Sequence, residues 1–181
     1  MKVLTETKRF LLREFEATDV DALYELDSDP EVRRYLGNKR VTDKAQLVEV
    51  INFIRQQYVD HGIGRWAVID KESNQFVGWS GLKFVTDITN HHSKFYDLGY
   101  RLIRKHWGKG IATETAIASL DYAFNHIKTD KVYASAAIDN HASNKVLQKI
   151  GMNLIDTYYY DDIECNWFCI THEEYAKRSN E

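Results

Sequence analysis

Proline and cysteine are both scarce in this chain of 181 residues, which has one proline and two cysteines. Two cysteines are too few for a disulfide scaffold, and Cys165 and Cys169 are spaced for the same face of one strand, where neighbours do not bridge easily. We therefore expect both to be reduced, in the core or half-buried. Because the sequence has no proline-rich or serine-rich linker, no repeat and no low-complexity segment, residues 1–181 are predicted to form a single domain with a substantial core.

The chain also lacks long apolar runs and an excess of positive charge. No stretch approaches the ~20 apolar residues that a membrane-spanning helix needs, and the charged segment from Met1 to Arg9 does not resemble a signal peptide. With 24 basic and 27 acidic residues, the net charge of −3 at pH 7 gives no indication of nucleic-acid binding. We expect a cytoplasmic monomer or homodimer with no membrane or nucleic-acid partner. The seven histidines have no metal-ligand spacing, so no metal site is predicted.

The periodicity of the apolar residues predicts one mixed α/β domain, in the order β-α-α-β-β-β-α-β-α-β-β. Cap residues and glycines at segment ends support the helix predictions. The expected helices cover residues 20–26, a turn starting at Pro30, 43–58, 108–127 and 141–150. The expected strands cover residues 10–15, 66–69, 76–79, 95–103, 131–138, 152–160 and 163–171.

A glycine-rich turn lies between one of these strands and the helix predicted over 108–127. Such a turn exposes unpaired backbone N–H groups beside the positive end of the helix dipole, which suits a pyrophosphate. Gly108 and Gly110 let the backbone approach the phosphate oxygens, while Lys105, Lys109 and the Thr113 hydroxyl add positive charge or a donor. The Walker spacing is absent, and a dinucleotide fingerprint needs a third glycine where Thr113 stands. The alternative is a turn that merely joins strand to helix.

Three further blocks accompany this turn in a fixed order along the chain. The four blocks are Asp97-Leu98-Gly99-Tyr100-Arg101-Leu102, Trp107-Gly108-Lys109-Gly110-Ile111-Ala112-Thr113-Glu114, Asn140-His141-Ala142-Ser143 and Val146-Leu147-Gln148-Lys149-Ile150-Gly151-Met152. Together they resemble the GNAT superfamily of N-acetyltransferases, and within it the bacterial N-terminal acetyltransferases of ribosomal proteins. The resemblance begins at Arg9-Phe10-Leu11-Leu12-Arg13 and reaches the final strand. It implies an α+β fold with a mixed, mostly antiparallel central sheet of about seven strands, flanked by helices.

The resemblance also implies that the ligand is acetyl-CoA. The strand that ends near Leu102 and Ile103 would pair with the pantetheine arm, and Asn140 and Ser143 match positions near the pantetheine or the thiol. A helix cap explains Asn140 equally well. Lys105 stands at the first loop position, where the superfamily usually has Arg or Gln. The backbone N–H groups that would hold the pyrophosphate belong to Gly108, Lys109, Gly110, Ile111, Ala112 and Thr113.

Acetyl transfer from a thioester to an amine needs a neutral amine, a stabilised oxyanion and a protonated leaving thiolate. Asp97 matches an acidic position of the family and is predicted to be the base, directly or through water; the alternative is a strand carboxylate that is exposed or salt-bridged. A backbone N–H near Leu102 or Ile103 would meet the oxyanion. Ser143 is the candidate acid by family position, because Leu147 replaces the tyrosine that many members use.

These features leave three readings of the function. The leading one is an acetyl-CoA-dependent N-acetyltransferase whose acceptor is a protein or peptide N-terminus, reacting by direct attack in a ternary complex. The second is acetylation of a small amine, such as a polyamine, an amino sugar or an antibiotic. The third is an acyl-CoA-binding module without catalysis, which the Leu147 departure motivates. An acetyl-cysteine route is not predicted, because no Cys–His pairing is visible.

Overall fold

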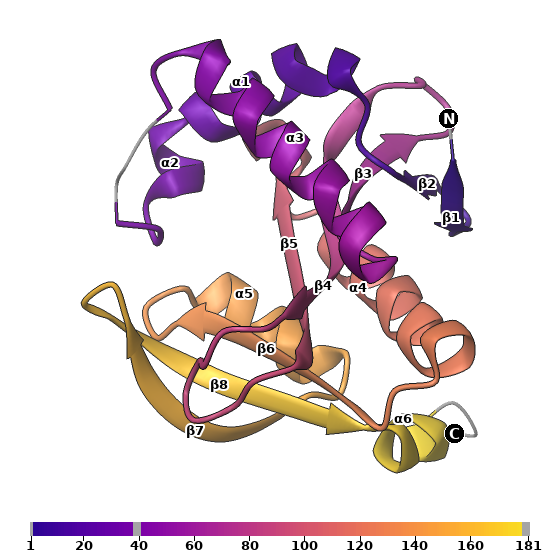
Figure 1. The fold of residues 1–181 in the computed structure, drawn as a ribbon, viewed down its shortest axis with the longest axis vertical. Helices are drawn as coiled ribbons and strands as arrows, with labels where there is room; N and C mark the ends of the chain where they lie inside the picture. Colours follow the sequence, from indigo (N-terminus) through magenta and orange to yellow (C-terminus); the bar gives the residue numbers. More distant parts are fainter. Residues whose placement is uncertain (1, 38–40, 179–181) are drawn as a thin grey trace.

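The computed structural model describes residues 2–37 and 41–178, and its centre is an eight-stranded sheet (Figure 1). The strand order is β1-β2-β3-β4-β5-β6-β8-β7, and every neighbouring pair is antiparallel except β5 and β6. The mixed, mostly antiparallel sheet predicted from the sequence is confirmed. The strands are β1 (Val3–Glu6), β2 (Phe10–Arg13), β3 (Arg65–Asp70), β4 (Phe76–Val85), β5 (Phe95–Leu102), β6 (Lys131–Ala137), β7 (Asn153–Tyr160) and β8 (Ile163–Thr171).

The sheet has one strand more than the seven predicted, and the additional strand is β1. It has four residues, lies at the edge of the sheet and buries none of its side chains fully. A half-exposed edge strand needs no apolar alternation. The segment before Phe10 therefore gave no strand signal in the sequence.

Three of the helices described here start where the sequence supplies a side-chain cap, and two of these caps are aspartates. The Asp29 side chain accepts from the backbone N–H of Glu31 ahead of Pro30, and the Asp43 side chain accepts from that of Ala45. The C-terminal helix α6 was not predicted. The helices are α1 (Val20–Ser28), α2 (Pro30–Arg33), α3 (Lys44–His61), α4 (Ile111–Tyr122), α5 (His141–Lys149) and α6 (His172–Arg178), with 3₁₀ turns at Ala17–Asp19 and Arg104–His106 and a π-helical turn at Ala123–Ile127.

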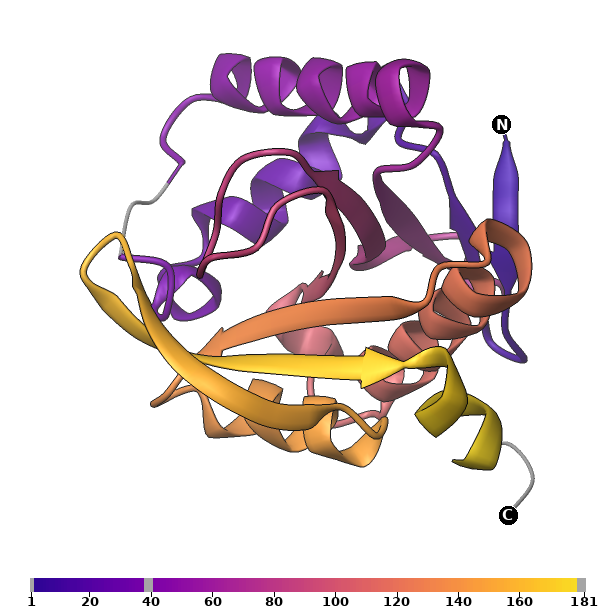
Figure 2. The same ribbon diagram turned by 60° about the horizontal axis from the view of Figure 1, so that its bottom comes forward.

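Helices cover both faces of the sheet, as the two views show (Figures 1 and 2). The face under α1 and α3, called the front face below, packs Ala67, Ile69 and Ile103 against these helices in one buried cluster. The rear face packs Trp66, Val68, Leu98 and Leu102 against α4 and α5 in a second, larger cluster. Because side chains alternate along a strand, the odd-numbered residues of β5 point to the front face and the even-numbered ones to the rear.

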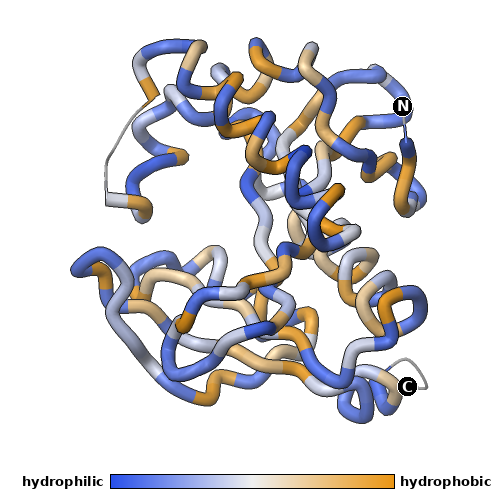
Figure 3. The backbone as a smooth tube through the Cα atoms, in the orientation of Figure 1, coloured by the Kyte–Doolittle hydropathy of each residue, from blue (hydrophilic) through white to orange (hydrophobic). Residues whose placement is uncertain are grey.

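The long helix α3 shows how the sequence pattern selects the buried side of an element. Hydrophobic positions recur along it among hydrophilic ones (Figure 3). Leu47 and Ile51, four residues apart, are buried under it, whereas Phe53 and Val59 are exposed. The Tyr58 hydroxyl donates to the backbone carbonyl of Arg65 and accepts from the N–H of Phe15, which fixes α3 to the start of β3.

Candidate active site

The glycine turn between β5 and α4 leaves the start of α4 without a side-chain cap. Gly108 and Gly110 have φ angles of +71° and +73°, a left-handed conformation that favours glycine. Gly110 is the N-cap residue, and no side chain caps the helix. The first intrahelical hydrogen bond of α4 runs from the Glu114 N–H to the Gly110 carbonyl, at 3.1 Å. The three preceding N–H groups, at residues 111–113, therefore have no acceptor within the helix and are available to an anion.

The helix predicted over 108–127 accordingly begins at Ile111, because the two left-handed glycines precede it. Thr113 lies in the first turn of α4, and Lys109 is exposed. The Lys105 Nζ atom lies 2.9 Å from Oε1 of Glu25 on α1. This turn, with free N–H groups and no Cβ atoms at two of its positions, fits a pyrophosphate of the kind that acetyl-CoA carries.

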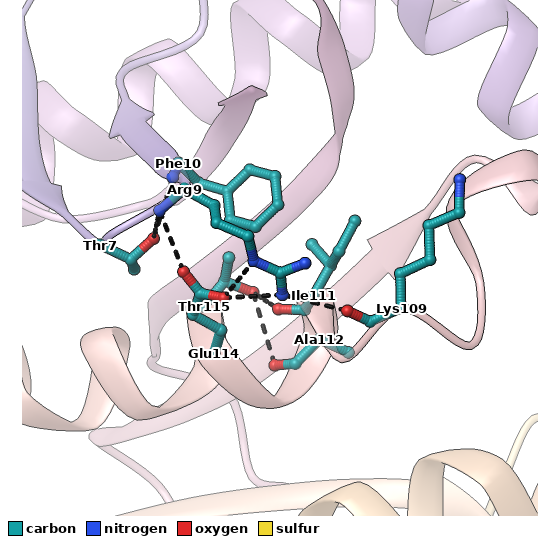
Figure 4. Close-up of polar contacts among 8 residues, drawn as sticks. All are labelled: Thr7, Arg9, Phe10, Lys109, Ile111, Ala112, Glu114 and Thr115. Atoms are coloured by element: carbon teal, nitrogen blue, oxygen red, sulfur yellow. Dashed lines mark hydrogen bonds and ion pairs between the residues drawn. The ribbon is translucent and has the colours of Figure 1, made fainter. Parts of the chain in front are cut away.

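Arg9, the residue just before β2, contacts both the glycine turn and the first turn of α4 (Figure 4). The Arg9 Nε atom donates to Glu114 Oε2 at 2.7 Å, and its Nη2 atom donates to the Lys109 carbonyl at 3.0 Å. Burial raises the pKa of Glu114, but hydrogen bonds from Thr7 and Arg9 outweigh it and leave that pKa below its usual value. Figure 4 shows the Lys109 side chain extending away from this contact. This role of Arg9 was not predicted from the sequence.

A gap opens in the sheet next to the turn, because β5 and β6 diverge. Within the described residues, β5 pairs with β6 only at Asp97, opposite Tyr133, and Figure 1 shows the two strands running apart. The Ile103 N–H donates to Val77 on β4 at 3.0 Å. Since N–H groups alternate in direction along a strand, the N–H of Leu102 points to the gap instead.

This geometry separates the two candidates for the oxyanion donor. The N–H of Ile103 is already engaged with β4, whereas the N–H of Leu102 faces the gap. The Leu102 carbonyl accepts from the Trp107 indole nitrogen at 2.8 Å, which ties the end of β5 to the glycine turn. Leu102 is therefore the better placed of the two residues for a backbone donor.

Asp97 lies on the front face and is paired with Arg65 of β3. Oδ2 of Asp97 is 2.5 Å from the Arg65 guanidinium, which also donates to the Asp97 and Gly81 carbonyls at 2.6 and 2.5 Å. Lys83 Nζ lies 4.0 Å from the same oxygen. Burial lowers the pKa of both Arg65 and Lys83, with Asp97 opposing the shift in each case. The salt-bridged carboxylate named among the alternatives is present, and the role of Asp97 as base stays a prediction.

Ser143 lies at the start of α5, on the other side of the gap. The Asn140 side chain accepts from the Ser143 N–H at 3.1 Å, so the cap expected as one of the two roles of Asn140 is present. The Tyr100 hydroxyl reaches across from β5 to the Ser143 carbonyl at 3.0 Å and to Ser143 Oγ at 3.1 Å. Leu147, at the usual tyrosine position, is 1% exposed and belongs to the rear core.

The predicted residues therefore gather around one gap, but on two sides of it. Asp97 faces the front of the sheet, and Tyr100 with Ser143 faces the rear. A base on one side and a hydroxyl donor on the other suit a reaction in which a nucleophile approaches from one face and a leaving group departs on the other. Cys165 and Cys169 are free thiols, one buried and one partly buried, as expected. The described residues contain no cluster of three or more His, Cys, Asp or Glu that could hold a metal ion.

Comparison with known proteins decides the family. A model described as an acetyltransferase (GNAT) domain matches residues 9–153. The chain belongs to the GNAT family. It is therefore an N-acetyltransferase, and the donor that this family uses is acetyl-CoA. It is 31% identical to an uncharacterized N-acetyltransferase, p20, of Bacillus licheniformis, over 80% of this chain and 79% of that protein.

Solved structures of GNAT proteins share the fold over almost the whole chain. A GNAT-family acetyltransferase from Bacillus anthracis is 25% identical, with a TM-score of 0.77 over 96% of this chain and 99% of that one. A spermidine N-acetyltransferase from Vibrio cholerae, solved with CoA and spermine, is 18% identical with a TM-score of 0.76 over 94% and 99% of the two chains. A ribosomal-protein-S5-alanine acetyltransferase from Vibrio fischeri is 16% identical, with a TM-score of 0.72 over 94% and 97%. At such identities the last two show the fold alone.

Proposed function

We propose that this GNAT enzyme acetylates the α-amino group of a protein or peptide N-terminus, by direct attack of the amine on acetyl-CoA in a ternary complex. In this proposal Asp97 takes the proton of the amine, directly or through water, and the Leu102 N–H meets the oxyanion. Ser143 supports the departing sulfur. Two contacts support this assignment: the Trp107 indole ties the Leu102 carbonyl to the glycine turn before α4, and Tyr100 of the same strand contacts Ser143.

The observation that favours a polypeptide acceptor is the exposed edge strand β7. It ends the sheet on this side, and its Ile155, Tyr159 and Tyr160 side chains are 53%, 70% and 58% exposed. An edge strand offers unpaired backbone groups and side-chain contacts to an extended peptide. Tyr158 of the same strand lies near the site: burial raises its pKa to about 12, and the charge of Asp97 adds to that shift.

Charge on the front face argues against a polyamine acceptor. Asp97 is paired with Arg65, and Asp27 lies 2.6 Å from the Arg101 guanidinium. Both arginines also lie over the Trp79 ring, at 5.3 and 5.0 Å from its centroid. Lys83 also lies near Asp97 and Arg33 near Asp27, so four cationic side chains face two carboxylates here, and a polyamine would add several positive charges at an unfavourable Coulomb energy. An N-terminal amine brings one charge, and loses it before attack.

An acceptor screen that follows release of free thiol from acetyl-CoA tests this proposal. The panel contains two kinds of lysine-containing peptide, one with a free N-terminus and one with an acetylated N-terminus. It also contains three small amines: spermidine, an amino sugar and an aminoglycoside. We expect turnover with free N-termini and little with the blocked peptides. Faster turnover of spermidine or an amino sugar would support a small-amine enzyme instead. Tight binding of acetyl-CoA without turnover on any amine would indicate a binding module.

A further inference from the structure

The rear wall of the gap contains two hydroxyl groups in contact, those of Tyr100 and Ser143. Their oxygens are 3.1 Å apart, and the Ser143 carbonyl lies 3.0 Å from the Tyr100 oxygen. The contact joins β5 to α5 across the place where β5 and β6 no longer pair. Burial raises the pKa of Tyr100 to about 12, with the Ser143 hydrogen bond opposing the shift, so the phenol stays protonated at neutral pH.

The two short distances allow the single Tyr100 proton two positions. If the phenol donates to the Ser143 carbonyl, the Tyr100 oxygen is left as an acceptor and can hold the Ser143 proton within this pair. If the phenol donates to Ser143 Oγ, that oxygen has an acceptor site filled and its own proton is free to point into the gap. A hydroxyl donates only one hydrogen bond. The direction of the Tyr100 proton therefore decides what the Ser143 proton can reach.

We propose that Tyr100 is a positioning residue for the leaving thiolate: by donating to Ser143 Oγ, it directs the Ser143 proton to the sulfur of coenzyme A. This rests on the proposed function, which places Ser143 beside the sulfur. When the C–S bond breaks, its electron pair goes to sulfur, and the Ser143 hydrogen bond stabilises the negative charge there. The proton that completes the thiol comes from solvent, and the proton of the amine leaves through Asp97 or water, so the two balance.

This arrangement accounts for the loss of the usual acid. Leu147 is sealed in the rear core and offers no proton. A thiol has a pKa of about 8.5, so a thiolate leaves near neutral pH with the help of a hydrogen bond rather than a full proton transfer. The Tyr100 and Ser143 hydroxyls beside the start of α5 supply such a bond. The partial positive charge of the helix N-terminus also stabilises the negative charge of the thiolate.

The first test measures binding rather than turnover. A donor that favours the thiolate lowers the pKa of the bound thiol, so the affinity for CoA should rise with pH between the bound pKa and the free pKa of about 8.5, and level off above it. For the wild-type protein, the Kd of CoA should fall between pH 6.5 and 8.5. This fall should be roughly fivefold to tenfold larger than the fall for desulfo-CoA, which has no thiol. In Y100F this excess should disappear while desulfo-CoA binds as before. An unchanged excess in Y100F would overturn the proposal.

The second test uses turnover with two acetyl thioesters, acetyl-CoA and one whose thiol is more acidic. Y100F should lower kcat with acetyl-CoA by about tenfold, leave KM near its wild-type value, and have a smaller effect with the better leaving group. The double variant Y100F/S143A should be no slower than S143A, because both act on one hydroxyl. Additive effects, or equal losses with both thioesters, would show a structural contact only. Loss of folded enzyme would also lower both rates equally, so folding cannot imitate the expected result.

Tyr96→Phe is the matched control: Tyr96 points to the same face of β5 as Tyr100, and its ring packs on the Phe84 ring of β4, with centroids 5.2 Å apart. It should keep wild-type kinetics and wild-type binding of CoA. If wild-type protein shows no turnover with any amine, the proposed function fails and this proposal with it. If wild-type protein turns over and Y100F behaves like Y96F, only the Tyr100 proposal fails.

Discussion

At the scale of single residues, Arg65 sets the environment of Asp97. It is 12% exposed at its side chain, and its guanidinium is held by two backbone carbonyls and by the ring of Trp79. These contacts fix the Asp97 carboxylate at the position where β5 and β6 last pair. A base held in this way keeps one oxygen toward Arg65, so only its other oxygen can serve an amine or a water molecule.

Asp97→Asn should lower kcat by about 100-fold at pH 7, because removal of a general base costs at least that much in typical enzymes. The loss should shrink as the pH rises above the pKa of about 8 of an α-amino group, where the free amine is neutral without help. The measurement is the pH profile of kcat for both proteins. Asp21→Asn, at a surface carboxylate paired with Lys44, is the control. A loss that stays constant over the whole pH range would rule out Asp97 as base.

Gly99→Ala should disturb the same pair sterically. A Cβ at Gly99 would lie 2.6 Å from a guanidinium nitrogen of Arg65, so the arginine must move away from Asp97. We expect a loss of about 1–3 kcal/mol in the free energy of unfolding, typical of overpacking, together with reduced turnover. Gly62→Ala is the control, because Gly62 has a φ of +70° and open space around it. It should cost stability and leave turnover per folded molecule unchanged; equal turnover in both variants would contradict this account.

At the scale of elements, the start of α4 depends on β2. Arg9, which immediately precedes β2, joins the two through Glu114 and the Lys109 carbonyl, so the glycine turn is held by a residue 100 positions away in sequence. The cap that most helices have is replaced here by a contact that leaves the N–H groups free. This is how the turn can be ordered and still open to an anion.

Arg9→Ala should loosen the turn and raise the Kd of acetyl-CoA by roughly threefold to tenfold, the equivalent of one or two hydrogen bonds. Titration calorimetry measures the change. Lys2→Ala is the control, since it removes a surface ion pair, to Glu14, just before the neighbouring strand β1. If the two variants bind acetyl-CoA equally well, Arg9 does not organise the turn.

The same contact should contribute stability that depends on pH. The folded pKa of Glu114 lies below its ordinary value, so its contribution is complete above the unfolded pKa of about 4.3 and is lost as the pH falls through the folded pKa. Glu114→Gln should therefore lower Tm at pH 7 and have a smaller effect at about pH 3.5. Thermal unfolding of both proteins at the two pH values tests this. An equal difference at both would show that the carboxylate charge does not matter.

At the scale of the whole molecule, the gap, the turn and the two helical layers combine parts from both ends of the chain. The front face and the rear face lie on opposite sides of the sheet, and the gap between β5 and β6 is the place where the sheet opens. In the proposed function, acetyl-CoA binds beside this gap and its binding is coupled to the fold of the sheet. None of the helices within residues 2–37 and 41–178 is both long and apolar enough to cross a membrane.

Acetyl-CoA should therefore stabilise the whole fold. At a concentration of 100 times Kd, binding adds about 2.7 kcal/mol, which corresponds to a rise in Tm of roughly 5–10 °C for a chain of this size. Thermal unfolding with and without the ligand measures it. Adenosine, which lacks the pyrophosphate and the pantetheine, should give little shift at the same concentration. A Tm that acetyl-CoA leaves unchanged would contradict binding at this site.

The sequence by itself determined the elements and the family, because these depend on local patterns. Capping residues located the starts of α2, α3 and α5, and the spacing of Gly108, Gly110 and the flanking blocks indicated a GNAT enzyme that uses acetyl-CoA. The edge strand β1 and the helix α6 were missed, since short exposed segments carry no periodic signal. Asn140 as a cap followed from its residue type alone.

Only the tertiary structure decided which residues share the site. Arg65 meets Asp97 because β3 and β5 flank the same strand, and Tyr100 meets Ser143 because β5 and β6 diverge beneath α5. Both pairs span more than 30 residues, and no local pattern encodes such contacts. The choice of Leu102 over Ile103 also needed the register of β5 on β4, because one residue along a strand reverses the direction of its N–H.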